Sequence, residues 1–273
     1  MPLFTAYKDS ANCNKNTNKE ASFLVIIVEM QELPDTITFL GTAGARFMVT
    51  KQFLASGGAW LNLGGTEIVL DPSKLNAIIL SHKHLDHSVD INIMIEAMTE
   101  GGRKQQGIVF APSDALNQSA VILPYLQSYP QRIDVLSEGK SYSIGDIQFE
   151  TPIRHHHGVE TYGFVFRTPR YTFSWITDTK YFANLPGYYR AELLIINVLI
   201  LDPKGLVDHL SLPEARQIIE EVRPKAAILT HFGTSMWRAK PRKLAMQLSK
   251  DIGIPVIAAR DGMKFDLAEL EVL

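Results

Sequence analysis

The stretch Ala77-Ile-Ile-Leu-Ser-His82-Lys-His84-Leu-Asp86-His87 places three histidines and an aspartate directly after a short apolar run. The apolar residues predict a buried β-strand that ends at the cluster. Imidazoles this close together are costly to bury or to protonate unless they are solvated, as in a polar loop, or hold a metal ion. Imidazole and carboxylate groups are ligands that borderline divalent cations such as Zn²⁺ prefer. His82 and His84 can face one way from an extended chain, with Asp86 and His87 beside them, which favours two ions over one.

Length, charge and cysteine content limit the class of protein. The chain has 273 residues, 46% of them hydrophobic, and a formal net charge of −2. This length predicts one large domain or two closely packed halves. The near-balance of charge excludes a chain-wide field for nucleic acid or membranes, but allows a local patch. The single cysteine, Cys13, excludes an internal disulfide framework and clusters of several thiolates, so a metal site must use histidine and carboxylate ligands.

The N-terminal segment differs in composition from the rest of the chain. Residues 1–20 are polar, and we expect residues 1–35 to form a tail ahead of one domain over residues 36–273. The apolar run at 23–28 is too short for a secretory signal peptide and predicts an added edge strand over 23–30. Nothing approaches the run of about 18 apolar residues that spans a membrane. We therefore expect a cytoplasmic protein without membrane partners.

Short apolar, β-rich runs alternate with helices from residue 36 onward. One helix is predicted after the capping pair Ser211 and Glu214, a second from about Pro241 to Gly253, and a third begins near Ser88. Sheets covered by helices, an α/β layered domain, follow from this pattern. The predicted strands are Ile37–Leu40, Ala77–Leu80, Ile108–Phe110, Ile147–Glu150, Gly163–Phe166, Tyr171–Ile176, Leu193–Leu201, Ala226–Leu229 and Val256–Ala258.

Two further metal-ligating residue types follow predicted strands. Asp178 comes after the run that ends at Ile176, and His231 comes after another apolar run. Layered α/β sheets bind ligands at the carboxyl ends of their strands, so these side chains are expected near the 82–87 cluster. The run His155-His156-His157 offers one more imidazole, and any of the three could be a ligand.

Five segments in register resemble the metallo-β-lactamase superfamily. The signature H-x-H-x-D-H is intact at residues 82–87, and the segment from His157 to Gly163 is similar to that of the phosphodiesterase and tRNA-processing (RNase Z-like) branch. The resemblance covers most of residues 36–265. It implies a four-layer αββα sandwich of two facing mixed β-sheets, with a metal site at one edge between them. The other three segments are Ile37–Gly44, Thr177-Asp178-Thr179 and Ile228–Gly233.

The resemblance also implies a set of ligands and a cofactor. Spacing to Tyr162-Gly163 favours His157, which leaves His155 and His156 as supporting or surface residues. Two divalent ions, zinc first and manganese or iron as alternatives, would share a hydroxide that attacks the substrate. The implied ligands form two sites that share one carboxylate: His82, His84 and His157; Asp86, His87 and His231; and Asp178 bridging both.

A further histidine is expected to act on the substrate. Asp208-His209-Leu-Ser211 resembles an element of the same branch in which a histidine reaches the scissile phosphate. Metal ions activate the nucleophile, but a departing alkoxide still needs a proton, which such a group can supply. We therefore place His209, together with Asp86, among the catalytic residues. The alternative is a loop histidine beside a helix N-cap.

The resulting hypothesis is an enzyme, a dinuclear metal-dependent hydrolase acting on a small anionic phosphodiester. Hydrolysis of a lactone, β-lactam or thioester uses the same metal ions, and a non-catalytic metal-binding protein is the remaining class. His84 stands where diiron oxygen-reducing members have an acidic residue, which favours hydrolysis over redox chemistry. The sequence is compatible with a homo-oligomer. The turn over residues 71–76 is unusually short.

An RNA-processing endonuclease is a further alternative. The long basic, glycine- and proline-rich arm with which tRNA-processing members grip tRNA is not evident, which lowers the expectation of RNA binding. A basic cluster could steer an anionic substrate or be an ordinary solvated turn and helix face. It consists of Arg238, Lys240, Arg242 and Lys243.

Overall fold

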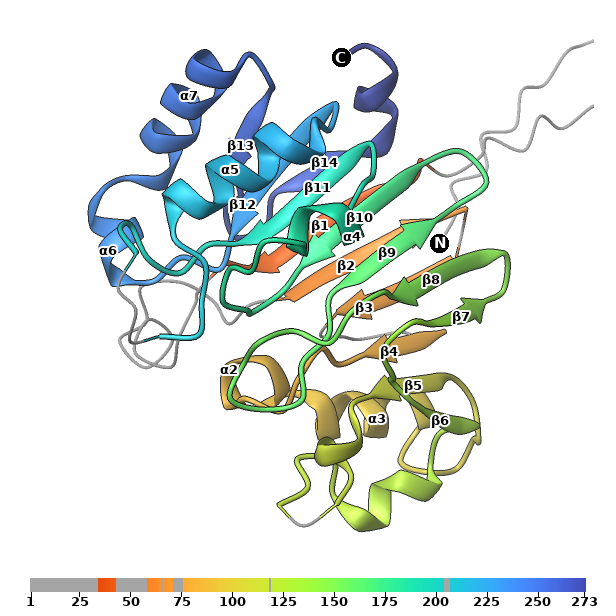
Figure 1. Ribbon diagram of the computed structural model, residues 1–273. Coiled ribbons are helices and arrows are strands. Elements are labelled where there is room, and N and C mark those ends of the chain that lie inside the picture. The colour runs from red at the N-terminus through yellow and green to blue at the C-terminus, as the bar shows by residue number, and fades with distance from the viewer. Residues whose placement is uncertain (1–33, 43–57, 65, 71–75, 118, 204–206) are drawn as a thin grey trace, which may run out of the picture. The chain divides into compact units, whose positions relative to one another are not determined.

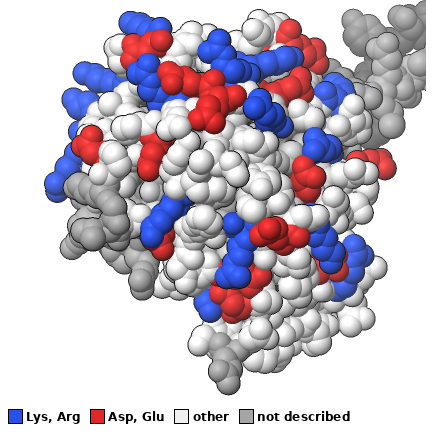
Figure 2. Space-filling view, viewed as in Figure 1, with Lys and Arg blue, Asp and Glu red and all other residues white. Residues whose placement is uncertain are grey.

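The computed structural model describes residues 34–42, 58–64, 66–70, 76–117, 119–203 and 207–273. The expected edge strand over 23–30 and most of the turn over 71–76 lie outside these residues. In the described part of the chain, no helix combines the length and the apolar character needed to cross a membrane. Basic and acidic side chains alternate on the face shown in Figure 2 and do not gather into a field of one sign.

Two mixed sheets, with seven strands each among the described residues, form the centre of the fold (Figure 1). The first sheet is antiparallel from β14 to β3 and parallel from β3 to β6. Its strands lie in the order β14 (Lys264–Asp266), β1 (Thr36–Gly41), β2 (Gly58–Leu63), β3 (Thr66–Leu70), β4 (Ala77–Ile79), β5 (Ile108–Ala111) and β6 (Arg132–Val135).

The second sheet has the same division. It is parallel from β13 to β10 and antiparallel from β10 to β7. Mixed sheets of this kind confirm the predicted fold class. The strands lie in the order β13 (Val256–Ala258), β12 (Ala226–Thr230), β11 (Leu193–Asn197), β10 (Thr172–Ile176), β9 (Phe164–Arg167), β8 (Ile147–Thr151) and β7 (Lys140–Ile144).

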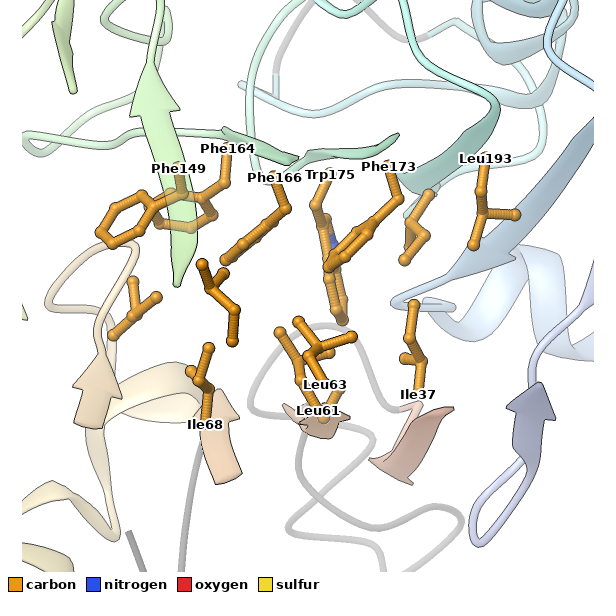
Figure 3. Packing of buried hydrophobic residues seen from close by; sticks show 14 of the residues in the cluster. Ile37, Leu61, Leu63, Ile68, Phe149, Phe164, Phe166, Phe173, Trp175 and Leu193 are labelled. Carbon is orange, nitrogen blue, oxygen red and sulfur yellow. The ribbon is translucent and has the colours of Figure 1, made fainter. Parts of the chain in front are cut away.

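Alternation along the strands divides the apolar residues between three clusters. In β4, Ala77 and Ile79 face the core between the sheets, whereas Ile78 faces the helical layer outside. In β11, Leu193 belongs to the inner core and Leu194 to the outer cluster. Successive side chains of a strand point to opposite faces, so a strand buried on both sides is apolar throughout. Figure 3 shows the inner core, where aliphatic residues of the first sheet meet aromatic residues of the second.

Helices cover the outer face of each sheet and complete the four layers (Figure 1). Ser211 and Glu214 cap α5 as predicted, with Glu214 Oε2 accepting hydrogen bonds from Ser211 N (2.7 Å) and Oγ (2.6 Å). Gly253 ends α7 at a left-handed φ of 68°. Beside the first sheet lie α2 (Leu85–Ser88), α3 (Ile91–Thr99) and the 3₁₀ turns η1 (Ser113–Ala115) and η2 (Pro124–Ser128). Beside the second lie α4 (Leu185–Tyr188), α5 (Leu212–Val222), α6 (Thr234–Arg238) and α7 (Pro241–Ile252), and η3 (Leu267–Glu271) follows β14.

Two predicted boundaries were wrong. The strand expected to reach Leu201 ends at Asn197, because Leu199 N donates to Leu210 O (3.2 Å) and the chain turns toward a new partner. The helix expected to begin near Ser88 begins at Ile91 as α3, because Ser88 is the last residue of the separate short helix α2. Five strands were also not predicted: β2, β3, β6, β7 and β14. Of these, β6, β7 and β14 are edge strands with polar sequences, whereas β2 and β3 lie inside the first sheet and carry apolar residues.

Candidate metal centre

The predicted ligands meet at one edge of the sandwich, where the loops that follow several strands converge. His82 and His84 follow β4, and α2 then carries Asp86 and His87. The three remaining side chains lie after strands of the second sheet: His157 after β8, Asp178 after β10 and His231 after β12. Groups up to 149 positions apart in the sequence, from 82 to 231, are therefore brought to one place.

The first predicted triad is His82, His84 and His157, whose ligand atoms lie within 4.8 Å of one another. His84 Nδ1 and His157 Nε2 are 3.0 Å apart. The ring nitrogens that face away from the cluster have other partners: His82 Nδ1 lies 3.0 Å from Ser81 Oγ, and His157 Nδ1 lies 2.8 Å from Asp208 O. Such outer hydrogen bonds fix the tautomer and ring orientation of metal-binding histidines.

The second predicted triad is Asp86, His87 and His231, whose ligand atoms also lie within 4.8 Å of one another. The two Nε2 atoms of His87 and His231 are 3.0 Å apart, and Asp86 Oδ2 is 3.7 Å from His231 Nε2. His231 has a φ of 61°, in the left-handed region. A non-glycine residue held there is uncommon and marks a place where the surrounding structure imposes the conformation.

Asp178 lies between the two triads. Its Oδ2 atom is 3.6 Å from His82 Nε2 and 3.3 Å from His87 Nε2, and its Oδ1 atom is 3.4 Å from His231 Nδ1. Asn197 Nδ2 donates a 2.8 Å hydrogen bond to the same Oδ1, and Asn197 Oδ1 accepts one from Trp175 Nε1 (3.0 Å). This role of Asn197 was not predicted, although a polar side chain at the end of an apolar strand is a signal for it.

The chemistry of these donors fits divalent cations. Among the described residues, buried atoms that have no hydrogen-bond partner include His82 Nε2, Asp178 Oδ2 and His231 Nδ1. Buried polar atoms almost always have a partner, so three of them in one cluster require an explanation. Neutral imidazoles and ionised carboxylates are the forms that bind metal ions. Among the described residues, the groups that could hold an ion are the two predicted triads and two more that include Asp178: His82, His87 and Asp178; and His157, Asp178 and His209.

The electrostatics of the cluster favour those protonation states. Burial, followed by repulsion from His87, holds the pKa of His82 well below its usual value. Burial alone would raise the pKa of Asp178, but the neighbouring His231 and His87 hold it well below the usual range. The pKa of Asp86 is likewise lowered, because its contacts with His231 and His87 outweigh its burial. At neutral pH the cluster therefore offers an uncharged imidazole at His82 and charged carboxylates at Asp86 and Asp178.

His209 lies beside the cluster and borders an open cavity. Its Nδ1 atom is 3.6 Å from Asp178 Oδ2, and its ring centre is 5.0 Å from that of His157. Burial lowers the pKa of His209 to about 4. The cavity has a volume of about 220 Å³ and is also lined by Lys180, Tyr181 and Glu214. Lys180 pairs with Asp208, the residue before His209, at 2.7 Å.

His155 and His156 have different environments. His155 is buried, with Nε2 2.6 Å from Tyr189 Oη and Nδ1 3.2 Å from Asp178 O, so it supports the turn that carries Asp178. His156 is exposed and packs its ring against Phe182. Tyr189 packs so closely against Gly163 that a Cβ at this position would lie 2.5 Å from Tyr189 Oη, so only glycine fits there. His155 is therefore the supporting residue of the pair.

The burial of His155 predicts a loss of stability in acid. Burial lowers its pKa to about 3, whereas an unfolded histidine titrates near pH 6.5. As the pH falls below about 6.5, the unfolded chain takes up a proton that the folded chain refuses. The free energy of unfolding of metal-free protein should therefore fall by on the order of 1 kcal/mol per pH unit from this group.

Urea unfolding at pH 7, 6, 5 and 4.5 measures that slope. We expect His155→Gln to reduce the slope, and His156→Gln, an exposed neighbour, to leave it unchanged. Equal slopes for wild type and His155→Gln would contradict the expectation. Enough slope should remain in His155→Gln from other buried histidines, such as His82, to serve as an internal reference.

The basic cluster predicted to steer a substrate is exposed at the junction of two helices. Arg238 ends α6, and Lys240, Arg242 and Lys243 surround the beginning of α7. The segment follows His231 along the chain. A role in substrate capture stays a prediction.

Comparison with known proteins agrees with this architecture. An uncharacterized protein of Methanocaldococcus jannaschii, MJ1374, is 26% identical over 253 residues, which cover 85% of this chain and 94% of that protein. The metallo-beta-lactamase fold protein YhfI from Bacillus subtilis has a TM-score of 0.69 at 19% identity, covering 86% of this chain and 100% of its own. A diphosphatase of the PhnP family has a TM-score of 0.61 at 17% identity, covering 86% and 98%.

The family comparison covers most of the region that carries the cluster. Residues 62–232, more than half of the chain, match the family described as the beta-lactamase superfamily domain. This range begins in β2 and ends just after His231, so it includes every predicted ligand. The solved structures share the fold at low identity. The chain belongs to the beta-lactamase superfamily and has the metallo-β-lactamase fold.

Proposed function

We propose that this protein is a dinuclear metal-dependent hydrolase of small phosphodiesters. The observation that carries the proposal is the position of Asp178, which contacts imidazoles of two separate triads and also lies 3.6 Å from His209. Two groups of donors around one carboxylate suit a pair of divalent cations, with zinc as the first choice and manganese or iron as alternatives. Bound there, such ions supply Lewis acidity and lower the pKa of water.

The chain's own residues would perform the remaining work. His209 lies at the boundary between the cluster and the 220 Å³ cavity. With its pKa lowered to about 4 the neutral imidazole can donate a hydrogen bond to a departing oxygen, and it could donate a proton only after an anionic substrate beside it had raised that pKa. Lys180 and Asp208 hold the loop before His209, and Asp208 O faces the ring of His157. The cavity would receive the group that leaves.

A phosphodiester fits the site because its departing alkoxide needs such a donor. A diphosphatase is among the proteins of similar fold, which supports phosphoryl chemistry without establishing it here. Hydrolysis of a lactone or a β-lactam would use the same triads and would also expel an alkoxide or an amine that needs a proton, so His209 alone does not separate these substrates from a phosphodiester. The choice between these substrates can be made by measurement.

A substrate panel tests the proposal. Protein reloaded with Zn²⁺ or Mn²⁺ is assayed on bis(p-nitrophenyl) phosphate, a lactone, a β-lactam and a thioester. We expect kcat/KM for the phosphodiester to exceed every other value by at least about tenfold, a difference of about 1.4 kcal/mol in transition-state stabilisation. Chelation should remove the activity and added metal should restore it. A higher kcat/KM on any of the other three substrates would overturn the phosphodiester assignment.

A further inference from the structure

A network of hydrogen bonds links the two loops of the first predicted triad. Glu160 Oε2 accepts hydrogen bonds from Ser113 Oγ (2.5 Å) and Asp114 N (3.3 Å), and its Oε1 accepts one from Tyr162 Oη (2.8 Å). Burial would raise the pKa of Glu160, but the hydrogen bonds from Ser113 and Tyr162 outweigh it and lower the pKa. The charged carboxylate thus ties the loop after His157 to η1 of the first sheet.

The same turn also contacts the segment that carries the signature histidines. Asp114 Oδ2 accepts a hydrogen bond from Glu160 N (3.2 Å) and lies 3.3 Å from Lys83 Nζ, between His82 and His84 in the sequence. Tyr162 N donates to Ser81 O at 3.2 Å. Residues 113–114 therefore contact Lys83, in the loop after β4 of the first sheet, and Glu160, in the loop after β8 of the second sheet.

This network bears on the spacing of one pair of ligands. His84 follows β4 of the first sheet and His157 follows β8 of the second, yet their ring nitrogens are 3.0 Å apart. Neither loop can set that separation alone, because each belongs to a different sheet. The second triad has other supports, since Asp86 and His87 lie on α2 and His231 directly follows β12.

We propose that Glu160, acting with Ser113 and Asp114, is a positioning residue that sets the separation of His84 and His157 and thereby the affinity of the first metal site alone. The inference rests on the proposed metal-dependent function. Hydrogen bonds behind a ligand commonly govern metal affinity by 10- to 100-fold. Loss of the network should therefore weaken one of two metal equivalents.

Glu160→Ala and Glu160→Gln form a matched pair for the test. Both remove the charge, but only glutamine keeps an oxygen that accepts from Ser113 and Asp114 and an amide that can donate to Tyr162 Oη. Any difference between them therefore reports hydrogen bonding and not charge. Glu150→Gln is the control for an unrelated Glu→Gln change, because it removes the ion pair between Glu150 on β8 and Arg167 on β9.

The measurement is a titration of the metal-free full chain with Co²⁺, followed by the visible absorption of the bound ion. We expect wild type and Glu150→Gln to bind two equivalents. In Glu160→Ala one equivalent should keep the wild-type affinity and the other should bind at least about tenfold more weakly. Glu160→Gln should come within about threefold of wild type. The spectrum of the tight equivalent should match that of His84→Ala, which lacks a ligand of the first site.

Several results would overturn the inference. These are equal weakening of both equivalents, no weakening of either, or a surviving spectrum that matches His231→Ala. Should Glu160→Ala fail to fold by circular dichroism, Ser113→Ala decides, since it removes one hydrogen bond without a charge change and should weaken the same equivalent less. If the two metal equivalents differ in affinity in Glu160→Ala as expected, but the wild-type protein cleaves no phosphodiester, only the substrate assignment is contradicted. Wild type that binds fewer than two ions would overturn both.

Discussion

Replacing Asp178 with alanine is expected to lower phosphodiester hydrolysis by at least about 10⁴-fold. The change removes a buried carboxylate that contacts His82 of one triad and both His87 and His231 of the other. Loss of an outer hydrogen bond behind a ligand already costs 10- to 100-fold, and loss of a ligand that serves two ions affects both. Metal content should fall from two ions per chain to one or fewer.

Metal content and thermal unfolding of the Asp178→Ala protein check the cause. A ligand that binds only the folded state raises the unfolding temperature, so Zn²⁺ should stabilise wild type and stabilise the variant much less. Asp134→Ala, which removes an exposed carboxylate paired with Arg132 on β6, serves as the control and should keep both metal and activity. An Asp178→Ala protein that keeps two ions and wild-type kcat would show that Asp178 is not a shared ligand.

Replacing His209 with alanine is expected to lower kcat by about 10²- to 10³-fold while both metal ions remain bound. General acid catalysis contributes of this order, and His209 lies at the cavity and outside both predicted triads. Because His209 also forms a group of possible ligands with His157 and Asp178, the metal content of the variant has to be measured alongside kcat. The loss should depend on the leaving group. Diesters with alkoxide leaving groups should suffer most, because p-nitrophenolate departs without a proton.

A comparison of the two leaving groups separates the roles open to His209. If His209 stabilises charge in the transition state and does not donate a proton, His209→Ala should lower both rates equally. His156→Ala provides the matched control, since that imidazole is exposed and packs against Phe182. Unchanged kcat in His209→Ala with either substrate would remove His209 from the catalytic residues.

The predicted ligand side chains, which the structure brings together, were recognisable because their signal is local. The H-x-H-x-D-H signature sits within six residues, and both Asp178 and His231 come directly after apolar strands whose ends meet at one edge of a layered fold. The caps of α5 were predictable for the same reason, since Ser211 and Glu214 are three residues apart.

The supporting residues could not be predicted, because their partners are distant in the sequence. Asn197 is 19 positions from Asp178, His155 is 34 from Tyr189, and Glu160 is 46 from Asp114. Each pair forms only when two strands or the two sheets pack together. Short polar or exposed strands such as β6 escaped prediction because pairing with a neighbour, and not an apolar run, holds them in place.

Residue type and spacing thus identify which chemistry this chain can carry, since imidazoles and carboxylates behind apolar strands are favourable only where something binds them. Distances of 3.0 to 3.7 Å between ligand atoms that follow different strands, the place of Asp178 between two triads and the link through Glu160 arise from the packing of one sheet on the other. Contacts across such separations depend on the whole chain being folded, and no local pattern of residues encodes them.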